Sequence, residues 1–240
     1  MQTLIFNDSD ELSRAYAEWL MEKTKTVLAG SDRFTLALSG GSTPKKLYKL
    51  LAAEPYKSGI QWSKIHFFWG DERFVPFSDE KNNAKMAFDE LLDKVDVRRD
   101  QVHIMDTSLH PDASVAHYDE ILHRYFDDNT GFDLVMLGLG DNAHTLSLFP
   151  WYPIVHDNTS WVSAFFLEEQ DMFRISLTKV LVNRSSSITW LVAGADKASS
   201  VKAVMEGPAN ADLYPAQVIN NGEREMVWFL DKAAAADLAL

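Results

Sequence analysis

The chain has 240 residues, of which 46% are hydrophobic, and its formal net charge is −12 at pH 7. This hydrophobic share supports a sizeable core and excludes extensive disorder, while the acidic surface argues against nucleic-acid binding. Cysteine is absent, which excludes disulfides and thiolate metal sites. The first residues lack a basic segment before a long apolar core, and no apolar run approaches the roughly 18 residues that span a bilayer. We therefore expect a cytoplasmic protein that binds neither membranes nor nucleic acids.

Hydrophobic spacing predicts strands and helices that alternate along most of the chain. The expected strands span residues 4–6, 34–38, 65–69, 102–105, 132–137, 161–167, 174–177, 188–192 and 226–230. A first helix begins at the capping pattern of Asp8 and Glu11 and ends at Gly30. Further helices are expected over residues 44–53, 82–95, 112–126 and 195–205, and an alanine-rich helix follows the last strand. This alternation indicates an α/β protein.

Most of the expected strands are apolar at all positions or at all but one, which is typical of a parallel sheet covered by helices on both faces. We therefore predict a three-layer α/β/α fold with a doubly wound, mostly parallel sheet of the Rossmann-like type. Residues 1–240 contain no repeat, low-complexity linker or composition break, so we expect one domain. Ligands of such folds bind beyond the carboxyl ends of the strands. Three of these strand ends, which begin at Ser39, Gly70 and Gly138, are followed by residues that could bind or react with a ligand.

The first of these strand ends is the segment at residues 39–44, in which two adjacent glycines allow a sharp turn and a close approach to a ligand. We expect Thr43 to be the N-cap and Pro44 the first residue of the following helix. The free amides and the dipole of that helix would bind an anion. A bound anion would also explain why Lys45 and Lys46 stand in a first turn that disfavours cations. The alternative is a capped corner without a ligand.

The second strand end, Gly70-Asp71-Glu72-Arg73, combines two carboxylates with a guanidinium. Arg73 could hold a phosphate through two parallel hydrogen bonds. The alternative is a solvated turn with a local ion pair. Two further cations, Arg174 at the start of a strand and Lys197 in the first turn of a helix, also lie beside ends of the expected sheet. They are candidates for binding an anionic substrate, and each could instead be a surface charge.

The third strand end, at residues 138–150, contains a histidine just past a glycine-rich turn. His144 is well placed there to act as a general base. Its neighbours Asp141 and Asn142 could orient or polarise the imidazole ring. The alternative is a histidine that serves only as a hydrogen-bond partner at the start of a helix.

The same segment matches the dinucleotide-binding pattern through Gly138, Gly140 and Ala143, and it follows a strand as that pattern requires. However, Pro150 and Pro153 cut the next helix short, which leaves too little chain for a βαβ crossover. We therefore do not expect a nicotinamide cofactor.

These segments together resemble the 6-phosphogluconolactonase family, and they occur in the family's order over nearly the whole chain. The matching segments are residues 39–44, 70–73, 138–150, 174–178, 194–198 and 228–231. The resemblance implies a doubly wound fold shared with glucosamine-6-phosphate deaminases. It also implies hydrolysis of 6-phosphogluconolactone in the oxidative pentose phosphate pathway, with no metal and no cofactor. The expected partner is a small phosphorylated sugar lactone, bound by a monomer or a homodimer.

The resemblance also assigns roles, with His144 as the general base and with Arg73 and Lys197 as phosphate ligands. The candidate catalytic residues are His144, Asn142 and Asp71. The candidate substrate- and phosphate-binding residues are Gly40, Gly41, Ser42, Thr43, Arg73, Arg174 and Lys197.

The segment before His144 departs from the family pattern, which usually reads acid-Asp-Gly-His. Asn142 replaces the second acid and Ala143 replaces the glycine. An amide can orient an imidazole by hydrogen bonding, but it cannot stabilise an imidazolium by charge. Either Asp141 takes that part, or the acid is dispensable, or activity is reduced. Because alanine disfavours positive φ, we expect a right-handed conformation at Ala143.

Two other functions compete with lactone hydrolysis. An amino-sugar phosphate deaminase on the same fold would need more acid–base groups, typically including an acid after the histidine. Here that segment reads Ser147-Leu148-Phe149-Pro150, which favours hydrolysis. The other alternative is a non-catalytic sugar-phosphate-binding protein, which the substitutions at Asn142 and Ala143 keep open.

Overall fold

Six parallel strands form the central sheet in the computed structural model, which describes residues 1–220, 222 and 224–239. In sheet order they are β1 (Gln2–Phe6), β9 (Glu225–Asp231), β8 (Ser187–Val192), β5 (Leu134–Leu137), β2 (Phe34–Leu38) and β3 (Ile65–Trp69). Every neighbouring pair in this sheet is parallel. The predicted α/β fold with a mostly parallel sheet is therefore confirmed.

A second, antiparallel sheet consists of β4, β7 and β6. Its strands are β4 (Asp71–Arg73), β7 (Met172–Leu177) and β6 (Val162–Leu167). Sequence patterns predicted β6 and β7 but missed β4, because three charged residues carry no hydrophobic signal of a strand. β4 follows β3 after one residue, so the small sheet begins directly at the carboxyl edge of the large one.

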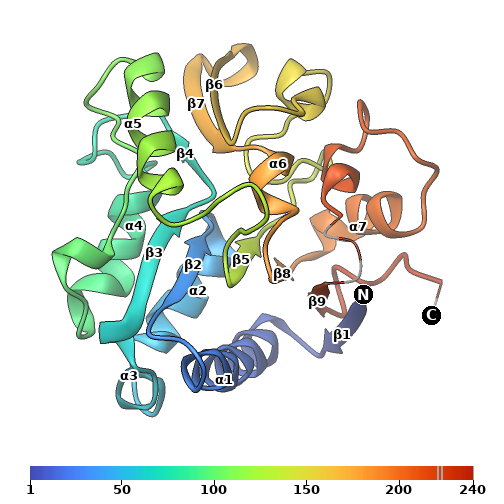
Figure 1. The fold of residues 1–240 in the computed structure, drawn as a ribbon. Helices are drawn as coiled ribbons and strands as arrows, with labels where there is room; N and C mark the ends of the chain where they lie inside the picture. The colour runs from blue at the N-terminus through green and yellow to red at the C-terminus, as the bar shows by residue number, and fades with distance from the viewer. Residues whose placement is uncertain (221, 223, 240) are drawn as a thin grey trace.

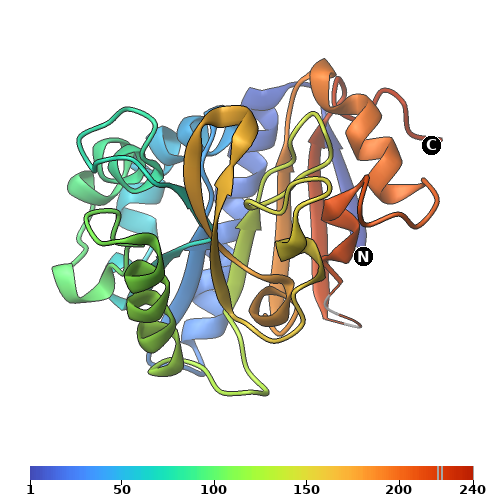
Figure 2. The ribbon, with the colours of Figure 1, turned by 90° about the horizontal axis from the view of Figure 1, so that it is seen from above.

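Helices cover both faces of the large sheet (Figures 1 and 2). The α-helices are α1 (Ser9–Leu28), α2 (Ser42–Leu51), α3 (Tyr56–Gly59), α4 (Asn83–Glu90), α5 (Pro111–His123), α6 (Lys179–Val182) and α7 (Ala198–Met205). The 3-10 helices are η1 (Trp62–Lys64), η2 (Leu92–Lys94), η3 (Arg99–Gln101), η4 (Pro153–His156), η5 (Glu168–Gln170), η6 (Ala195–Lys197) and η7 (Pro215–Val218). None of the described residues belongs to a helix that is long and apolar enough to cross a membrane.

Alternate side chains of the buried strands belong to two separate hydrophobic clusters, because successive residues of a strand point to opposite faces. Leu134 and Met136 of β5 pack in the cluster that includes α1, α2 and α4. Val135 and Leu137 pack in the cluster that includes α5, α7 and the small sheet. Burial on both faces explains why these strands are almost continuously apolar, as the sequence indicated.

Two predicted elements are wrong. Residues 102–105 do not form a strand, since only Val102 bridges to Phe67, and the side chain of Asp106 then caps a turn by accepting from the amide of Ser108. The alanine-rich segment after β9 forms turns instead of a helix. The Asp231 carboxylate accepts from the Ala234 amide, which stabilises a turn directly after the strand.

Candidate functional site

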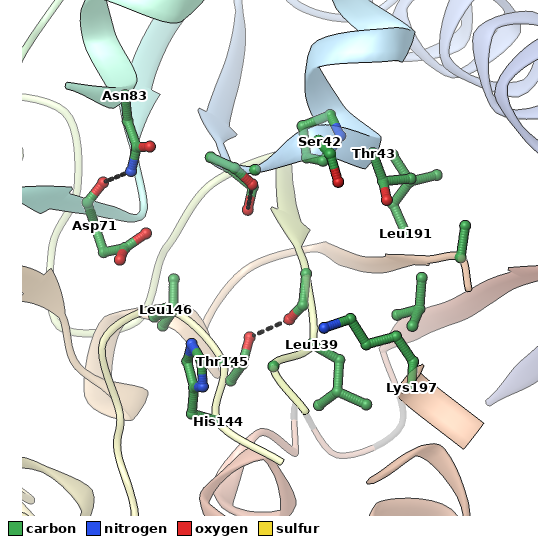
Figure 3. A pocket seen from close by; sticks show the side chains of 18 of the residues that line it. Ser42, Thr43, Asp71, Asn83, Leu139, His144, Thr145, Leu146, Leu191 and Lys197 are labelled. Atoms are coloured by element: carbon green, nitrogen blue, oxygen red, sulfur yellow. Dashed lines mark hydrogen bonds between the residues drawn. The ribbon is translucent and has the colours of Figure 1, made fainter. Parts of the chain in front are cut away.

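The carboxyl ends of β2, β3 and β5 meet at a cavity of about 230 Å³ (Figure 3). Nine of the ten candidate site residues line it, namely Gly40, Gly41, Ser42, Thr43, Asp71, Arg73, His144, Arg174 and Lys197. Asn142 does not line the cavity but contacts His144. The sheet therefore brings together the three strand ends that the sequence singled out.

Three glycines allow the loops of this site to pack closely, because each leaves room for a side chain from another segment or turn. A methyl group on each glycine would meet a neighbouring atom far inside van der Waals contact: Gly40 at 2.0 Å from Asn83 Oδ1, Gly70 at 2.6 Å from Leu146 Cδ2, and Gly140 at 2.0 Å from His144 Nδ1. The glycines are thus needed for the shape of the cavity wall as well as for the turns themselves.

Helix α2 begins one residue before the predicted N-cap. Its N-cap is Gly41, with φ of 101°, and no side chain caps the helix, so the prediction of Thr43 as N-cap and Pro44 as first helical residue is wrong. The positive φ of Gly41 turns the chain more sharply than an N-cap at Thr43 would require. The first amides of a helix have no intrahelical partner, and Ser42 and Thr43 line the cavity. These amides can therefore bind an anion.

The two lysines at the start of α2 do not require a bound anion to explain their position. The amine of Lys46 lies 2.6 Å from a carboxylate oxygen of Asp10 and donates to the hydroxyl of Ser9 at 2.8 Å. The amine of Lys45 lies 3.5 Å from a carboxylate oxygen of Glu90. Carboxylates of two other helices thus compensate the unfavourable helix dipole.

The second strand end is buried and is not the solvated turn that was the alternative. Glu72 is 1% exposed, and its carboxylate accepts from the backbone amides of Arg73 and Asn83 at 2.7 Å and of Ala84 at 2.8 Å. It thereby ties β4 to the first turn of α4. This contact also positions Asn83, whose side chain donates to the Asp71 carbonyl at 3.0 Å and lines the cavity.

We predict that Glu72→Ala lowers the free energy of unfolding by about 3–5 kcal/mol, because it leaves two buried amides and one half-buried amide without an acceptor. Urea denaturation followed by circular dichroism measures this loss. The exposed Glu80, in the loop between β4 and α4, supplies the matched control, and Glu80→Ala should change stability by less than about 0.5 kcal/mol. A Glu72→Ala midpoint equal to that of Glu80→Ala would contradict the anchoring role.

Asp71 and Arg174 form a buried polar network beneath the cavity. One oxygen of Asp71 accepts from the hydroxyl of Ser147 at 2.7 Å and lies 3.7 Å from Nη1 of Arg174. Nη2 of Arg174 donates to Gln170 at 2.6 Å, while its Nε is buried with no partner among the described residues. The guanidinium of Arg174, which lines the cavity, therefore has N–H groups that do not donate to any described residue.

The other two candidate cations approach the cavity from separate elements. Arg73, at the end of β4, donates from Nη1 to the Lys81 carbonyl at 3.1 Å, and its Nε has no partner in the described part of the chain. Lys197, at the end of η6, lies 2.9 Å from the carboxylate of Asp196, and Figure 3 shows its amine extending toward the cavity. Three cations thus border one small cavity in a protein of strongly acidic composition.

The ring of His144 stands in the cavity wall (Figure 3) and contacts Asn142 and Phe149. Its Nδ1 lies 2.5 Å from Oδ1 of Asn142, and its face stacks on Phe149 at 4.1 Å between ring centroids. Asn142, and not Asp141, is therefore the residue that contacts the ring. Burial lowers the pKa of His144 to about 4, while Asp71 and Asp141 oppose this shift and Arg174 and Lys197 add to it. The imidazole is thus neutral at pH 7.

Ala143 has a left-handed backbone with φ of 59°, so the predicted right-handed conformation is wrong. Three backbone hydrogen bonds close the chain around it: Ala143 N–H to the Gly140 carbonyl at 3.1 Å, Gly140 N–H to the His144 carbonyl at 2.8 Å, and Ala216 N–H to the Ala143 carbonyl at 3.0 Å. A left-handed alanine costs about 1–2 kcal/mol, which these bonds offset. Strain of this kind concentrates at functional sites.

The remaining expectations for the third strand end concern cofactors. Residues 138–161, between β5 and β6, contain no α-helix, so the glycine pattern lacks the helix that a dinucleotide site requires. Among residues 1–220, 222 and 224–239, no three histidine, aspartate or glutamate side chains cluster closely enough to hold a metal ion.

Sequence patterns missed two residues that support the site, Asn83 and Ser147. Both act through contacts with Asp71, and both come from segments in which polar residues are unremarkable. Asn83 lies within the helix predicted over residues 82–95, and the N-cap of that helix, α4, is Asn82. Only the fold brings Asn83 against Gly40.

Comparison with known proteins places this chain among enzymes of sugar-phosphate metabolism. The family model described as "Glucosamine-6-phosphate isomerases/6-phosphogluconolactonase" matches residues 7–228. "Probable 6-phosphogluconolactonase 3, chloroplastic" of Oryza sativa subsp. indica is 36% identical over 250 residues, covering 98% of this chain and 76% of the relative. "6-phosphogluconolactonase" of Nostoc sp. is 35% identical over 241 residues, covering 98% of both chains. The solved structure of 6-phosphogluconolactonase from Trypanosoma brucei has a TM-score of 0.89 and 26% identity, covering 99% of this chain and 98% of that chain.

Proposed function

Because the chain belongs to the family of glucosamine-6-phosphate isomerases and 6-phosphogluconolactonases, we propose that it hydrolyses 6-phospho-D-glucono-1,5-lactone to 6-phosphogluconate. The observation that carries this proposal is a neutral imidazole, His144, in the wall of a cavity that three cations also border. Hydrolysis of a phosphorylated lactone needs a general base to activate water and cationic groups to bind the phosphate. The reaction would belong to the oxidative pentose phosphate pathway.

Substrate binding begins with the phosphate. Arg73 and Lys197, from different elements, would hold it by charge-assisted hydrogen bonds, and Arg174 with the amides of Ser42 and Thr43 would bind the remaining oxygens of the substrate. Fixing the phosphate keeps the lactone carbonyl within reach of His144, which removes much of the entropic cost of bringing the reactants together.

Hydrolysis then proceeds in two proton transfers. Nε2 of His144 takes a proton from water as the water oxygen attacks the lactone carbonyl carbon, and donors at the start of α2 or a side chain stabilise the oxyanion. When the bond between this carbon and the ring oxygen breaks, the imidazolium returns the proton to the ring oxygen, which becomes a hydroxyl. The product is a carboxylic acid that ionises in solution, and His144 is again neutral.

We predict that Arg73→Ala raises KM for the lactone by about 10- to 30-fold with little change in kcat, because it removes one charged phosphate ligand worth roughly 1.5–2 kcal/mol. Initial rates over a range of lactone concentrations, corrected for spontaneous hydrolysis, measure both constants. Arg14→Ala is a matched control, since Arg14 is an exposed arginine on α1. An unchanged KM in Arg73→Ala would assign this guanidinium to loop structure alone.

The deaminase alternative lacks a carboxylate where its chemistry would need one. In the segment after His144, the hydroxyl of Ser147 donates to Asp71, Leu148 is buried, and Phe149 stacks on the imidazole. Measuring ammonia release from glucosamine 6-phosphate beside lactone hydrolysis separates the two activities. Tight phosphosugar binding with lactone hydrolysis no faster than in buffer would instead identify a non-catalytic sugar-phosphate-binding protein.

A further inference from the structure

The Asn142 side chain accepts from two nitrogens of one residue. Its Oδ1 lies 2.5 Å from Nδ1 of His144 and 3.3 Å from the backbone nitrogen of His144. A backbone N–H can only donate, so the shared atom must be the amide oxygen and not the amide nitrogen. An oxygen acceptor in turn requires a proton on Nδ1. The lone pair of the neutral imidazole is therefore on Nε2, which has no hydrogen-bond partner among the described residues.

An amide does not by itself fix the tautomer of a histidine. Its side chain can rotate by about 180° and present its NH2 group to Nδ1 in place of its oxygen. The reversed amide would donate to Nδ1, move the proton to Nε2 and abolish the basic nitrogen that faces the substrate. In this chain, rotation would also direct the NH2 group against the His144 backbone N–H. This contact is an Asx-turn across Ala143, in which the amide of residue 144 donates to the side chain of residue 142.

We propose that Asn142 is a positioning residue that locks His144 in the Nδ1–H tautomer and does so with a neutral group, leaving the imidazolium without a counter-ion on that side. The catalytic consequence rests on the proposed lactone hydrolysis, whereas the tautomer lock itself does not. The backbone N–H of His144 is the second donor, and it fixes the orientation of the Asn142 amide.

The charged groups that face His144 are Asp71, Asp141, Arg174 and Lys197, two of each sign, while its stacking partner Phe149 is apolar. Burial therefore decides the protonation of the ring and lowers its pKa to about 4. A carboxylate in place of Asn142 would add an anion within hydrogen-bond distance, and an opposite charge that close raises a histidine pKa by roughly 1–3 units. The neutral lock thus keeps the base unprotonated in mildly acidic solution.

Nitrogen-15 NMR of histidine-labelled protein tests the lock without substrate. At pH 7 we expect His144 to show a protonated Nδ1 and an unprotonated Nε2, with its signals assigned by their loss in His144→Gln. In Asn142→Asp the same tautomer should persist, and the titration midpoint of the ring should rise by about 1–3 pH units. Asn129→Asp, an exposed site with the same change of charge, should leave the midpoint unchanged.

Steady-state kinetics of lactone hydrolysis then test the effect of Asn142 on catalysis. Asn142→Leu, of similar volume but without an acceptor, should mix the tautomers and lower kcat about 10-fold with KM retained, and Asn142→Asp should restore kcat at pH 8. As the pH is lowered, kcat of Asn142→Asp should begin to fall at a higher pH than kcat of the native protein. The variant is therefore slower near pH 5. Because both proteins act on one substrate, the titration of its phosphate cancels.

An Nε2–H tautomer in the native protein overturns the lock, as does an Asn142→Asp midpoint equal to the native one. Asn142→Leu with native tautomer and native kcat does the same. Should Asn142→Leu not fold, the midpoint of Asn142→Asp decides alone. Absence of lactone hydrolysis with the expected NMR result contradicts the proposed function and leaves the lock intact, so the two failures are distinguishable.

Discussion

Replacing His144 by alanine should lower kcat for lactone hydrolysis by about 10²- to 10⁴-fold, the contribution of a general base. KM for the lactone, and the affinity for 6-phosphogluconate, should change little, because Arg73 and Lys197, the proposed phosphate ligands, lie on other elements. Rates must be measured against spontaneous hydrolysis, since a lactone is an activated ester and opens slowly in buffer. Calorimetric titration with 6-phosphogluconate measures the affinity.

His144→Gln is the control that separates loss of the general base from loss of packing. Glutamine preserves much of the side-chain volume that packs on Phe149 but provides no basic nitrogen. Both variants should therefore lose kcat to a similar degree, although only the alanine variant leaves a gap beside Phe149. Turnover near the native value in either variant would remove His144 from the mechanism and leave the cavity as a binding site.

The main features of this site could be predicted because they depend on short-range patterns. β5 is apolar throughout, and β2 and β3 are apolar at all but one position each, which indicates a parallel sheet; a parallel sheet aligns the carboxyl ends of its strands. The residues after those strands therefore had to meet, whatever the details of the helices. Asp71, Arg73 and His144, which follow these strands, line one cavity for this reason.

The features that could not be predicted depend on partners distant in the sequence. Lys46 was interpreted through the helix dipole, because nothing local showed that Asp10 would lie against it. The backbone of Ala143 was predicted from the steric preference of alanine, but a hydrogen bond from Ala216, 73 residues away, helps to hold it left-handed. Local preferences of 1–2 kcal/mol are decisive only where tertiary contacts do not oppose them.

Replacing Gly140 by alanine should lower kcat by at least about 100-fold while leaving the fold and KM nearly intact. The new methyl group would lie 2.0 Å from Nδ1 and 2.1 Å from Cε1 of His144, so the ring must leave its position. Rotation of the ring breaks its contact with Asn142 and its stacking on Phe149, and it removes Nε2 from the cavity. Initial rates give the loss, and thermal unfolding shows whether the fold persists.

Gly138→Ala is the matched control for this prediction, because Gly138 lies in the same loop and also lines the cavity. A methyl group there would be 3.7 Å from its nearest neighbour, Ser39 Oγ, which is an ordinary contact. Neither glycine has a positive φ, so backbone strain does not distinguish the two substitutions. A large loss in Gly140→Ala beside native turnover in Gly138→Ala therefore measures the displacement of one imidazole. Equal losses, or none in Gly140→Ala, would show that catalysis does not depend on where that ring stands.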